Sequence, residues 1–200
     1  PRVRRESGSE AEGSEETDLT RGTVLITGAM GALGRAFSRH LVEAHGVRHL
    51  LLLSRRGRKA DGALELISEL ESLGAESVEV VECDVSDYDA LAWVLDDIDP
   101  SRPLTAVVHL AGVLSDALVT EMTEERLYHV LAPKVDGAWN LHRLTENKTL
   151  RAFVLFSSVG GLLGNPGQSN YAVANNFLDA LAAHRRRRGV CATSIAWGPW

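Results

Sequence analysis

Short runs of apolar residues alternate along the chain with stretches in which apolar residues recur at every third or fourth position. The runs are typical of buried β-strands, and the periodic stretches are typical of amphipathic α-helices. We predict strands over residues 23–27, 49–54, 78–84, 104–111, 151–157 and 190–196. We predict helices over residues 32–44, 63–73, 86–98, 124–144 and 170–187, with Ser86 as the N-cap of the third helix and Pro133 interrupting the fourth.

The predicted strands are apolar along their whole length rather than at every second position. A strand of this kind is buried on both faces, which favours a parallel sheet. Because strands and helices alternate throughout, we predict an α/β fold with a doubly wound, Rossmann-like parallel sheet. Residues 1–21 are different, since glycine, serine and glutamate dominate them, and we expect a flexible acidic linker before a folded unit over 22–200.

Composition excludes several classes of protein. The chain has 200 residues, and 44% of them are hydrophobic, which suits one globular domain with a substantial core. Cys83 and Cys191 lie far apart without metal-ligand spacing, so we expect a reducing, cytoplasmic setting and no metal. No apolar run approaches the ~18 residues that a membrane span needs.

The net charge of −6 disfavours general nucleic-acid binding. The basic run over 185–188 lies at the end of a predicted helix, where cations stabilise the helix dipole. We therefore expect neither a membrane nor a nucleic acid among the partners.

The first predicted strand leads into a glycine-rich turn with the spacing G-x-x-G-x-x-G. Gly28 would allow the sharp turn, Gly31 would let the backbone approach a pyrophosphate, and Gly34 would let the next helix pack on the sheet. The N-terminus of that helix offers free N–H groups to phosphates. This strand–turn–helix context predicts a dinucleotide site, and a turn without a ligand is the alternative. The residues expected to contact the cofactor here are Thr27, Gly28, Met30, Gly31, Leu33 and Gly34.

The end of the second strand carries Arg55 and Arg56 and lacks the carboxylate that would bind the ribose 2′-hydroxyl of NAD. Guanidinium groups suit a 2′-phosphate, so we predict NADPH, with ordinary surface arginines as the alternative. Asp84 and Val85 end the third strand and could contact the edge of the adenine ring. A helix-capping turn at these two residues is an equal alternative. Further contacts are expected from Ser54, Asp84, Val85, Ala111 and Gly112.

A second group of polar residues follows the fifth strand. Ser158 ends that strand, Tyr171 begins the long helix, and Asn175 lies one turn later on the same helix face. A strand-end hydroxyl and a tyrosine on the next helix can converge on one carbonyl oxygen. Because a tyrosine with a pKa of ~10 is a poor acid near neutrality, this chemistry needs a nearby ammonium group.

These residues resemble the short-chain dehydrogenase/reductase superfamily, which usually places a lysine four residues after the tyrosine. Asn175 occupies that position here, and the three lysines, Lys59, Lys134 and Lys148, lie elsewhere. This exchange resembles the catalytic half of ketoreductase domains from modular polyketide synthases. The resemblance covers residues 22–200 and is carried by 27–34, 109–113, 133–139, 156–158, 166–168, 171–175 and 196–198.

The resemblance implies a catalytic tetrad of Lys134, Ser158, Tyr171 and Asn175. It also implies that Lys134 and Tyr171 contact the cofactor, and that Pro199 belongs to the loop that binds the nicotinamide carboxamide. The implied reaction is NADPH-dependent reduction of a β-keto group carried on the phosphopantetheine arm of an acyl carrier protein. The other domains of the same synthase are further implied partners.

Two other functions stay open at this point. One is a non-catalytic, structural ketoreductase half, and the other is a stand-alone reductase of a small ketone. The family surrounds this half with a structural subdomain and a lid helix. We therefore expect 22–200 to be an incomplete domain that is truncated at its C-terminus.

The resemblance also bears on stereochemistry. The family's B-type members carry a Leu-Asp-Asp motif, and this chain keeps the second aspartate as Asp116. A-type members carry a tryptophan eight residues before the tyrosine, where this chain has Leu163, and the proline of the epimerised subtype is Val173 here. With Gln168 as a third candidate for stereocontrol, the resemblance implies a B1-type enzyme that makes a D-hydroxyl.

Overall fold

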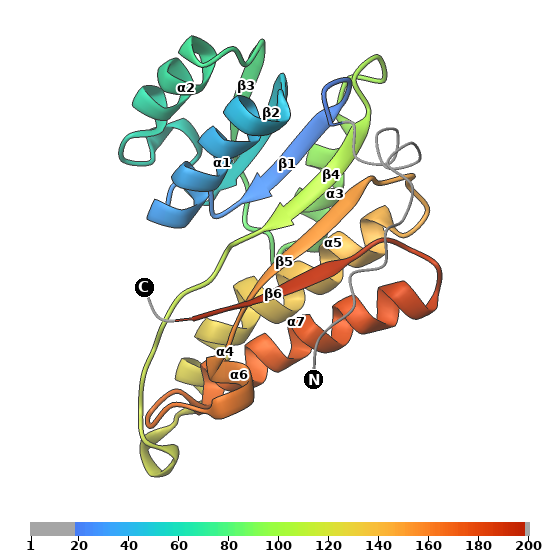
Figure 1. The fold of residues 1–200 in the computed structure, drawn as a ribbon. Helices are drawn as coiled ribbons and strands as arrows, with labels where there is room; N and C mark the ends of the chain where they lie inside the picture. The colour runs from blue at the N-terminus through green and yellow to red at the C-terminus, as the bar shows by residue number, and fades with distance from the viewer. Residues whose placement is uncertain (1–18, 199–200) are drawn as a thin grey trace, which may run out of the picture.

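The computed structural model describes residues 19–198, so Pro199 and most of the expected linker lie outside the described residues. Within that range, parallel strands form one six-stranded sheet of order β3-β2-β1-β4-β5-β6 (Figure 1). The strands are β1 (Thr23–Thr27), β2 (His49–Ser54), β3 (Ser77–Glu82), β4 (Leu104–His109), β5 (Ala152–Ser158) and β6 (Thr193–Trp197). This order confirms the predicted doubly wound fold, because strands are added on one side of β1 up to β3 and then on its other side from β4 onward.

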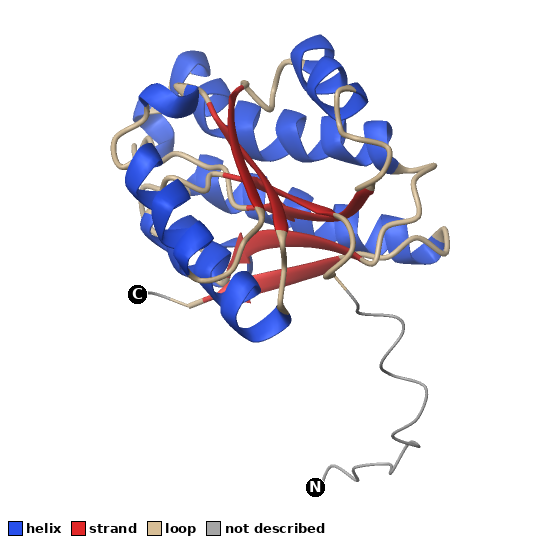
Figure 2. Cartoon of the chain, turned by 90° about the horizontal axis from the view of Figure 1, so that it is seen from above, coloured by secondary structure: helices blue, strands red, loops and turns tan. Residues whose placement is uncertain are grey.

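Helices cover both faces of the sheet, as the view from above shows (Figure 2). The α-helices are α1 (Ala32–His45), α2 (Ala63–Ser72), α3 (Tyr88–Asp96), α4 (Glu124–Leu131), α5 (Gly137–Thr145), α6 (Gly160–Leu163) and α7 (Ser169–Arg187). Shorter helical turns are the 3₁₀ segments η1 (Gly57–Lys59) and η2 (Val119–Glu121) and the π-helical segment η3 (Ala132–Asp136).

The central strands β1 and β2 are buried along almost their whole length because alternate side chains enter two different cores. On one face, Val24 and Ile26 pack in a cluster with Leu41 of α1 and Leu66 of α2. On the other face, Leu25 packs in a cluster that includes residues of α3, α5 and α7. Burying one such side chain is worth roughly 1.5–3 kcal/mol, so the two clusters fix the sheet between its helical layers.

Ser86 was predicted to cap the third helix, and this prediction is wrong. The Asp87 side chain caps α3 by accepting a hydrogen bond from Ala90 N at 3.0 Å. The backbone N–H and hydroxyl of Ser86 both donate to the Asp84 carboxylate, which holds Ser86 in the turn before the helix. Asp84 therefore forms the turn before the helix without capping it, and its contact with adenine stays a prediction.

Pro133 interrupts the long helical region, as predicted, and the structure shows how. Proline has no N–H to donate, and here the helix widens into η3 and then continues as α5. Lys134 lies inside this widened turn and is buried. The π-helical turn therefore brings a lysine side chain into the interior of the protein.

The basic run at the end of α7 is only partly a surface feature. Arg185 is fully buried, where its guanidinium lies 3.8 Å from the centre of the Phe153 ring and donates to the carbonyl oxygen of Cys191. Arg186 donates to the carbonyl oxygen of Ala192. The carbonyl groups of Cys191 and Ala192 are thus engaged by these arginines, and β6 begins later than predicted, at Thr193.

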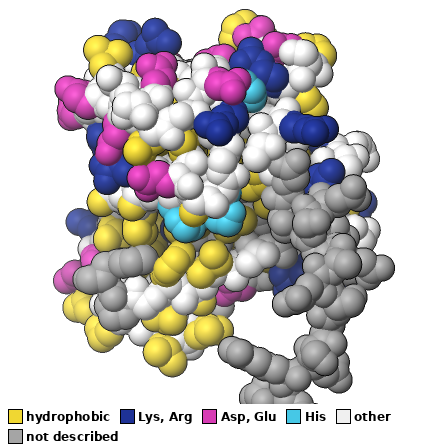
Figure 3. All heavy atoms as spheres, turned by 45° about the horizontal axis from the view of Figure 1, so that its top comes forward, with side chains coloured by type: hydrophobic (Ala, Val, Ile, Leu, Met, Phe, Trp, Pro, Cys, Tyr) yellow, Lys and Arg dark blue, Asp and Glu magenta, His cyan; other side chains and the backbone are white. Residues whose placement is uncertain are grey.

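Charged and apolar side chains are unevenly distributed over the surface. On the face in Figure 3, charged side chains crowd the upper part and apolar side chains gather in the lower part. Within residues 19–198, no helix is long and apolar enough to cross a membrane. Over the same residues, no group of three or more His, Cys, Asp or Glu side chains is arranged to hold a metal ion.

Candidate active site

A cavity of about 960 Å³ opens at the carboxyl ends of β1, β4 and β5. A second cavity of about 150 Å³ shares Gly28, Gly31, Gly112 and Val113 with it. The two cavities therefore form one trough across the position where the strand order reverses, which is where doubly wound sheets bind dinucleotides. Lys134, Ser158 and Tyr171 line the larger cavity together with Leu33 and Leu163, whereas Thr27, Met30, Ser54, Arg55, Asp84, Val85 and Ala111 line the smaller one.

Glycine is suited to each of its three positions in the turn for a different structural reason. Gly28 has a φ of +69°, and a Cβ atom there would lie 2.8 Å from the backbone N of Ala111. A Cβ atom on Gly34 would lie 2.6 Å from Ala29 Cα. A Cβ atom on Gly31 would meet only the Gly28 carbonyl oxygen, at 3.5 Å, so the space beside Gly31 is open. Two of the glycines thus allow the backbone to pack, and the third leaves room for a ligand.

The start of α1 suits a phosphate group. Gly31 occupies its N-cap position without a side-chain cap, and the first turn of α1 has no acidic residue. The backbone N–H groups of that turn therefore face the trough without a competing carboxylate. The glycine turn and the open side of Gly31 together fit a pyrophosphate.

The two arginines after β2 have different surroundings. Arg55 lines the smaller cavity. Arg56 forms an ion pair with Asp61 at 3.1 Å, on the exposed surface. Arg55 therefore lines the trough, whereas Arg56 is paired with Asp61 and lines neither of the two cavities.

Thr27 fastens the end of β1 to the end of β4. Its buried hydroxyl lies 2.7 Å from Nδ1 of His109 and accepts a hydrogen bond from Ala111 N at 3.1 Å. Burial, followed by the charge of Lys134, lowers the pKa of His109 to about 3, so the imidazole is neutral. These bonds fix the loop after β4 against the glycine turn.

Lys134 is the buried cation of the site, with 5% of its surface exposed. Its Nζ donates to the carbonyl oxygen of Phe156 and to Oδ1 of Asn175, each at 3.0 Å, and lies 5.3 Å from the centre of the Tyr171 ring. A Cβ atom on Gly112 would lie 2.9 Å from Lys134 Cε. Gly112 therefore makes room for the lysine side chain, a reason that its sequence position did not reveal.

Asn175 is fully buried beneath the lysine. Its Nδ2 donates to the carbonyl oxygen of Tyr171 at 2.8 Å, and its backbone carbonyl accepts from Ser157 Oγ at 3.2 Å. Ser158 accepts a hydrogen bond from Gly160 N at 3.1 Å. Of the four residues that the resemblance implied as a tetrad, Lys134, Ser158 and Tyr171 thus line the larger cavity, and Asn175 is hydrogen-bonded to two of them from below.

Burial lowers the pKa of Lys134 to about 8, and the negative charge of Asp179 acts in the opposite direction. The ordinary value is 10.5, so the unfolded chain binds this proton more tightly than the folded protein does. Folded stability should therefore increase as the pH rises from about 8 to 10.5. Below that window the charged, buried amine carries its full cost.

We expect this increase to disappear in Lys134→Met. Between pH 7 and pH 10.5, the free energy of unfolding of the wild type should gain about 3 kcal/mol relative to the variant. Urea unfolding of both proteins across the range measures the difference. Parallel stability curves for the two proteins would mean that the burial of Lys134 does not shift its titration.

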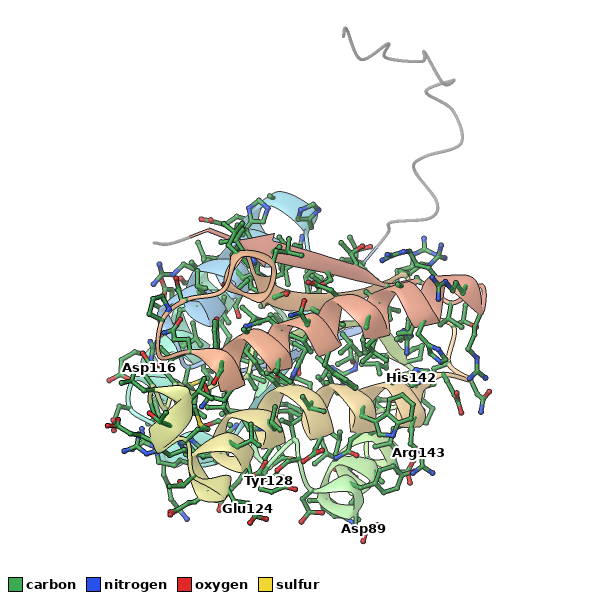
Figure 4. The ribbon with its side chains drawn as sticks, turned by 90° about the horizontal axis from the view of Figure 1, so that it is seen from below. Asp89, Asp116, Glu124, Tyr128, His142 and Arg143 are labelled. Carbon is green, nitrogen blue, oxygen red and sulfur yellow. The ribbon has the colours of Figure 1, made fainter. Side chains whose placement is uncertain are left out.

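Of the three candidates for stereocontrol, Leu163 lines the larger cavity, and Asp116 and Gln168 contact each other. The Asp116 carboxylate accepts a hydrogen bond from Nε2 of Gln168 at 3.0 Å. Leu163 lines the cavity with 83% of its surface exposed. Figure 4 shows Asp116 at the end of the molecule where α4 and α7 begin.

Sequence reasoning missed Asn170, the residue before Tyr171. Its side chain bonds to backbone atoms of the loop after β4, of α4 and of α7. Nothing in the local pattern of residues distinguishes it from a surface asparagine, because its partners are backbone groups distant in the sequence.

The model of the KR domain family matches residues 22–200. "Erythronolide synthase EryA2" of Saccharopolyspora erythraea is 58% identical over 179 residues, which are 90% of this chain and 5% of that protein. "Polyketide synthase GfsB" of Streptomyces halstedii is 56% identical over 179 residues, which are 90% of this chain and 3% of that protein. The chain therefore spans a small part of the length of these relatives.

Solved structures agree with the sequence relatives. "Structure of A-type Ketoreductases from Modular Polyketide Synthase" superposes with a TM-score of 0.88 at 45% identity, over 94% of this chain and 40% of that one. "The first ketoreductase of the tylosin PKS" superposes with a TM-score of 0.83 at 51% identity, over 90% of this chain and 38% of that one.

Proposed function

Because the chain belongs to the ketoreductase (KR) domain family of modular polyketide synthases, we propose that it reduces a β-ketoacyl thioester to the β-hydroxyacyl thioester with NADPH. The family is a branch of the short-chain dehydrogenase/reductases and uses a nicotinamide cofactor, which supplies the hydride when it is bound. One observation carries the proposal. Lys134, Ser158 and Tyr171 line a cavity that continues into the glycine turn, and the buried Asn175 accepts a hydrogen bond from Lys134 beneath it.

Tyr171 and Ser158 are the groups that would meet the ketone oxygen. Ser158 Oγ already accepts the Gly160 N–H, so its own hydroxyl proton is available to hydrogen-bond that oxygen. Negative charge builds up on the oxygen as the β-carbon is reduced, and Tyr171 donates the proton that neutralises it. The products are the β-hydroxyl and a tyrosinate that must be stabilised until it is protonated again.

Lys134 would stabilise that tyrosinate. Its pKa of about 8 keeps it largely protonated near neutrality, and both of its hydrogen-bond acceptors are neutral oxygens. Asn175 therefore orients the ammonium group and leaves its charge intact. A carboxylate in the same place would cancel that charge. The two bonds use two of the three N–H donors of the ammonium group.

The adenosine end of the trough supports NADPH through Arg55. We expect Arg55→Ala to raise the KM for NADPH by about 10- to 100-fold, since a hydrogen bond to a charged group is worth about 1.5–3 kcal/mol. The KM for NADH should change little. Arg56→Ala is the matched control, because the ion pair with Asp61 already engages Arg56 and its loss should matter much less. Equal use of NADH and NADPH by the wild type would refute the preference.

We propose that the substrate arrives on the phosphopantetheine arm of an acyl carrier protein and that other domains of the same synthase act with this one. The presence of the glycine turn in one trough with Lys134, Ser158 and Tyr171 argues against a purely structural role. The B1-type hypothesis, with a D-hydroxyl product, is supported by Asp116, which follows the cavity-lining Val113 and Leu114, and by Leu163 in the place of a tryptophan. Chiral analysis of the product tests it, and an L-hydroxyl would refute it.

A stand-alone reductase of a small ketone is distinguished by the substrate. If the domain acts in a synthase, kcat/KM should be higher for a β-ketoacyl group on a carrier protein than for the same acyl group on a short thiol. Equal values for the two substrates would favour the small-ketone reductase.

A further inference from the structure

Three separate segments of the chain meet at the side chain of Asn170, which is 1% exposed. Its Nδ2 donates to the carbonyl oxygen of Ser115 at 2.9 Å and to that of Arg126 at 3.3 Å. Its Oδ1 accepts the backbone N–H of Tyr171 at 2.8 Å. One amide group therefore joins the loop after β4, the first turn of α4 and the backbone of the tyrosine.

The loop that Asn170 holds is one wall of the reaction cavity. Val113 and Leu114 line the same cavity as Tyr171 and Ser158. The wall lies outside the helices and strands, and 59% of Leu114 is exposed, so packing contributes little to its position. Polar contacts must fix this wall.

Further hydrogen bonds reach the same wall from the residues just before α7. Ala117 N donates to the carbonyl oxygen of Gly167 at 2.8 Å, and Gln168 donates to Asp116. The Asp116 carboxylate is exposed to solvent, where water competes for its hydrogen bonds. The Asn170 amide is shielded from water, and an unmet partner there would cost more.

We propose that Asn170 is the positioning residue that holds the wall 113–117 in register with Tyr171, so that the ketone presents one face to the hydride. The inference rests on the proposed reduction. A prochiral ketone presents its other face when it rotates in the cavity, and a wall fixed relative to the proton donor prevents this rotation. Asn170 acts through the wall and the helix and makes no contact with the reacting atoms.

Two substitutions separate this role from its alternatives. Asn170→Asp keeps an oxygen that can accept the Tyr171 N–H, at a helix N-terminus that favours negative charge, but it cannot donate to Ser115 or Arg126. Asn170→Ser removes the same two bonds without adding charge. Agreement between the two variants therefore reports the loss of the two donated bonds, rather than the effect of a new charge beside Tyr171.

The measurement is the ratio of the two hydroxyl configurations formed from a β-ketoacyl thioester by the native protein with NADPH. We expect the minor configuration to increase about tenfold in both variants, which is the size of effect that one to two hydrogen bonds give. The Kd for NADPH should stay within about twofold of the wild-type value, because the glycine turn and Arg55 are untouched. Hydrogen exchange of the Ala117 amide should become faster in both variants.

Asn140→Ser is the matched control. Asn140 is also a buried asparagine whose Nδ2 donates to two backbone carbonyls, those of Val85 and Ser86. The free energy of unfolding of Asn140→Ser should decrease by an amount similar to that in the Asn170 variants. Its product configuration and the hydrogen exchange at Ala117 should stay as in the wild type.

Wild-type product ratios and wild-type exchange at Ala117 in both Asn170 variants would overturn the inference. So would an effect confined to Asn170→Asp, or an equal loss of configuration in Asn140→Ser. If the wild-type protein reduces no β-ketoacyl thioester, the proposed function fails. The exchange at Ala117 then decides the inference about Asn170, since it requires only folded protein.

Discussion

Tyr171→Phe should lower kcat by about 10²- to 10⁴-fold, which is the usual contribution of a positioned general acid. The phenyl ring can keep its place beside Lys134, whose Nζ lies 5.3 Å from the ring centre, so the shape of the cavity is retained. Only the transferable proton is lost. Steady-state kinetics with a β-ketoacyl thioester, together with the Kd for NADPH from fluorescence titration, measure the effect.

Tyr128→Phe is the matched control for this substitution. Tyr128 lies on α4 with 57% of its surface exposed, and the side-chain view shows it at the edge of the molecule (Figure 4). Removing the hydroxyl group of Tyr128 should leave kcat within about twofold of the wild-type value. A Tyr171→Phe variant with the same kcat as Tyr128→Phe would remove Tyr171 from the reaction.

Lys134→Met should lower kcat by about 10²- to 10³-fold, an effect of the size that is seen when one group that stabilises developing charge is removed. Methionine fills a similar volume, and the variant loses the ammonium group that lies beside Tyr171 and is bonded to Asn175. The tyrosinate left after proton transfer then lacks its stabilising cation. Lys148→Met, in an exposed loop after α5, is the control and should behave as the wild type.

The pH profile gives this prediction a second readout. With a Lys134 pKa of about 8, the kcat of the wild type should fall as the pH rises through that value. The residual activity of Lys134→Met should lack this step. A step at the same pH in both proteins would assign it to another group.

The fold could be predicted from the sequence because interactions between residues close in the chain determine its strands and its glycine turn. β1 and β2 match their predicted bounds, since a short apolar run between turn residues has few other solutions. The glycine turn was equally clear, because Gly28 and Gly34 are required by contacts within a few residues or with the adjacent strand end. Errors appeared at element ends, where Asp87 and Ser86 are both competent caps and the Asp84 carboxylate decides between them.

Features that depend on contacts between distant segments could not be predicted from the local sequence. Spacing alone gives no reason for Lys134 to reach Tyr171, and only the resemblance to a family placed it there. The structure supplies the physical cause, which is the π-helical turn at Pro133 and the space beside Gly112. Asn170 stayed hidden for the same reason, because its partners are backbone groups of other segments.

The central claim is that this chain directs hydride from NADPH to the β-carbon of a ketoacyl thioester while Tyr171 supplies the proton. The most direct test incubates the native protein with a β-ketoacyl thioester and NADPH that carries deuterium at the transferable C4 position, and analyses the product by mass spectrometry. We expect one deuterium on the β-carbon of a hydroxyacyl product, one NADPH oxidised for each product formed, and almost no product from Tyr171→Phe. A wild-type protein that forms no β-hydroxyacyl product, or forms it without deuterium, would contradict the account.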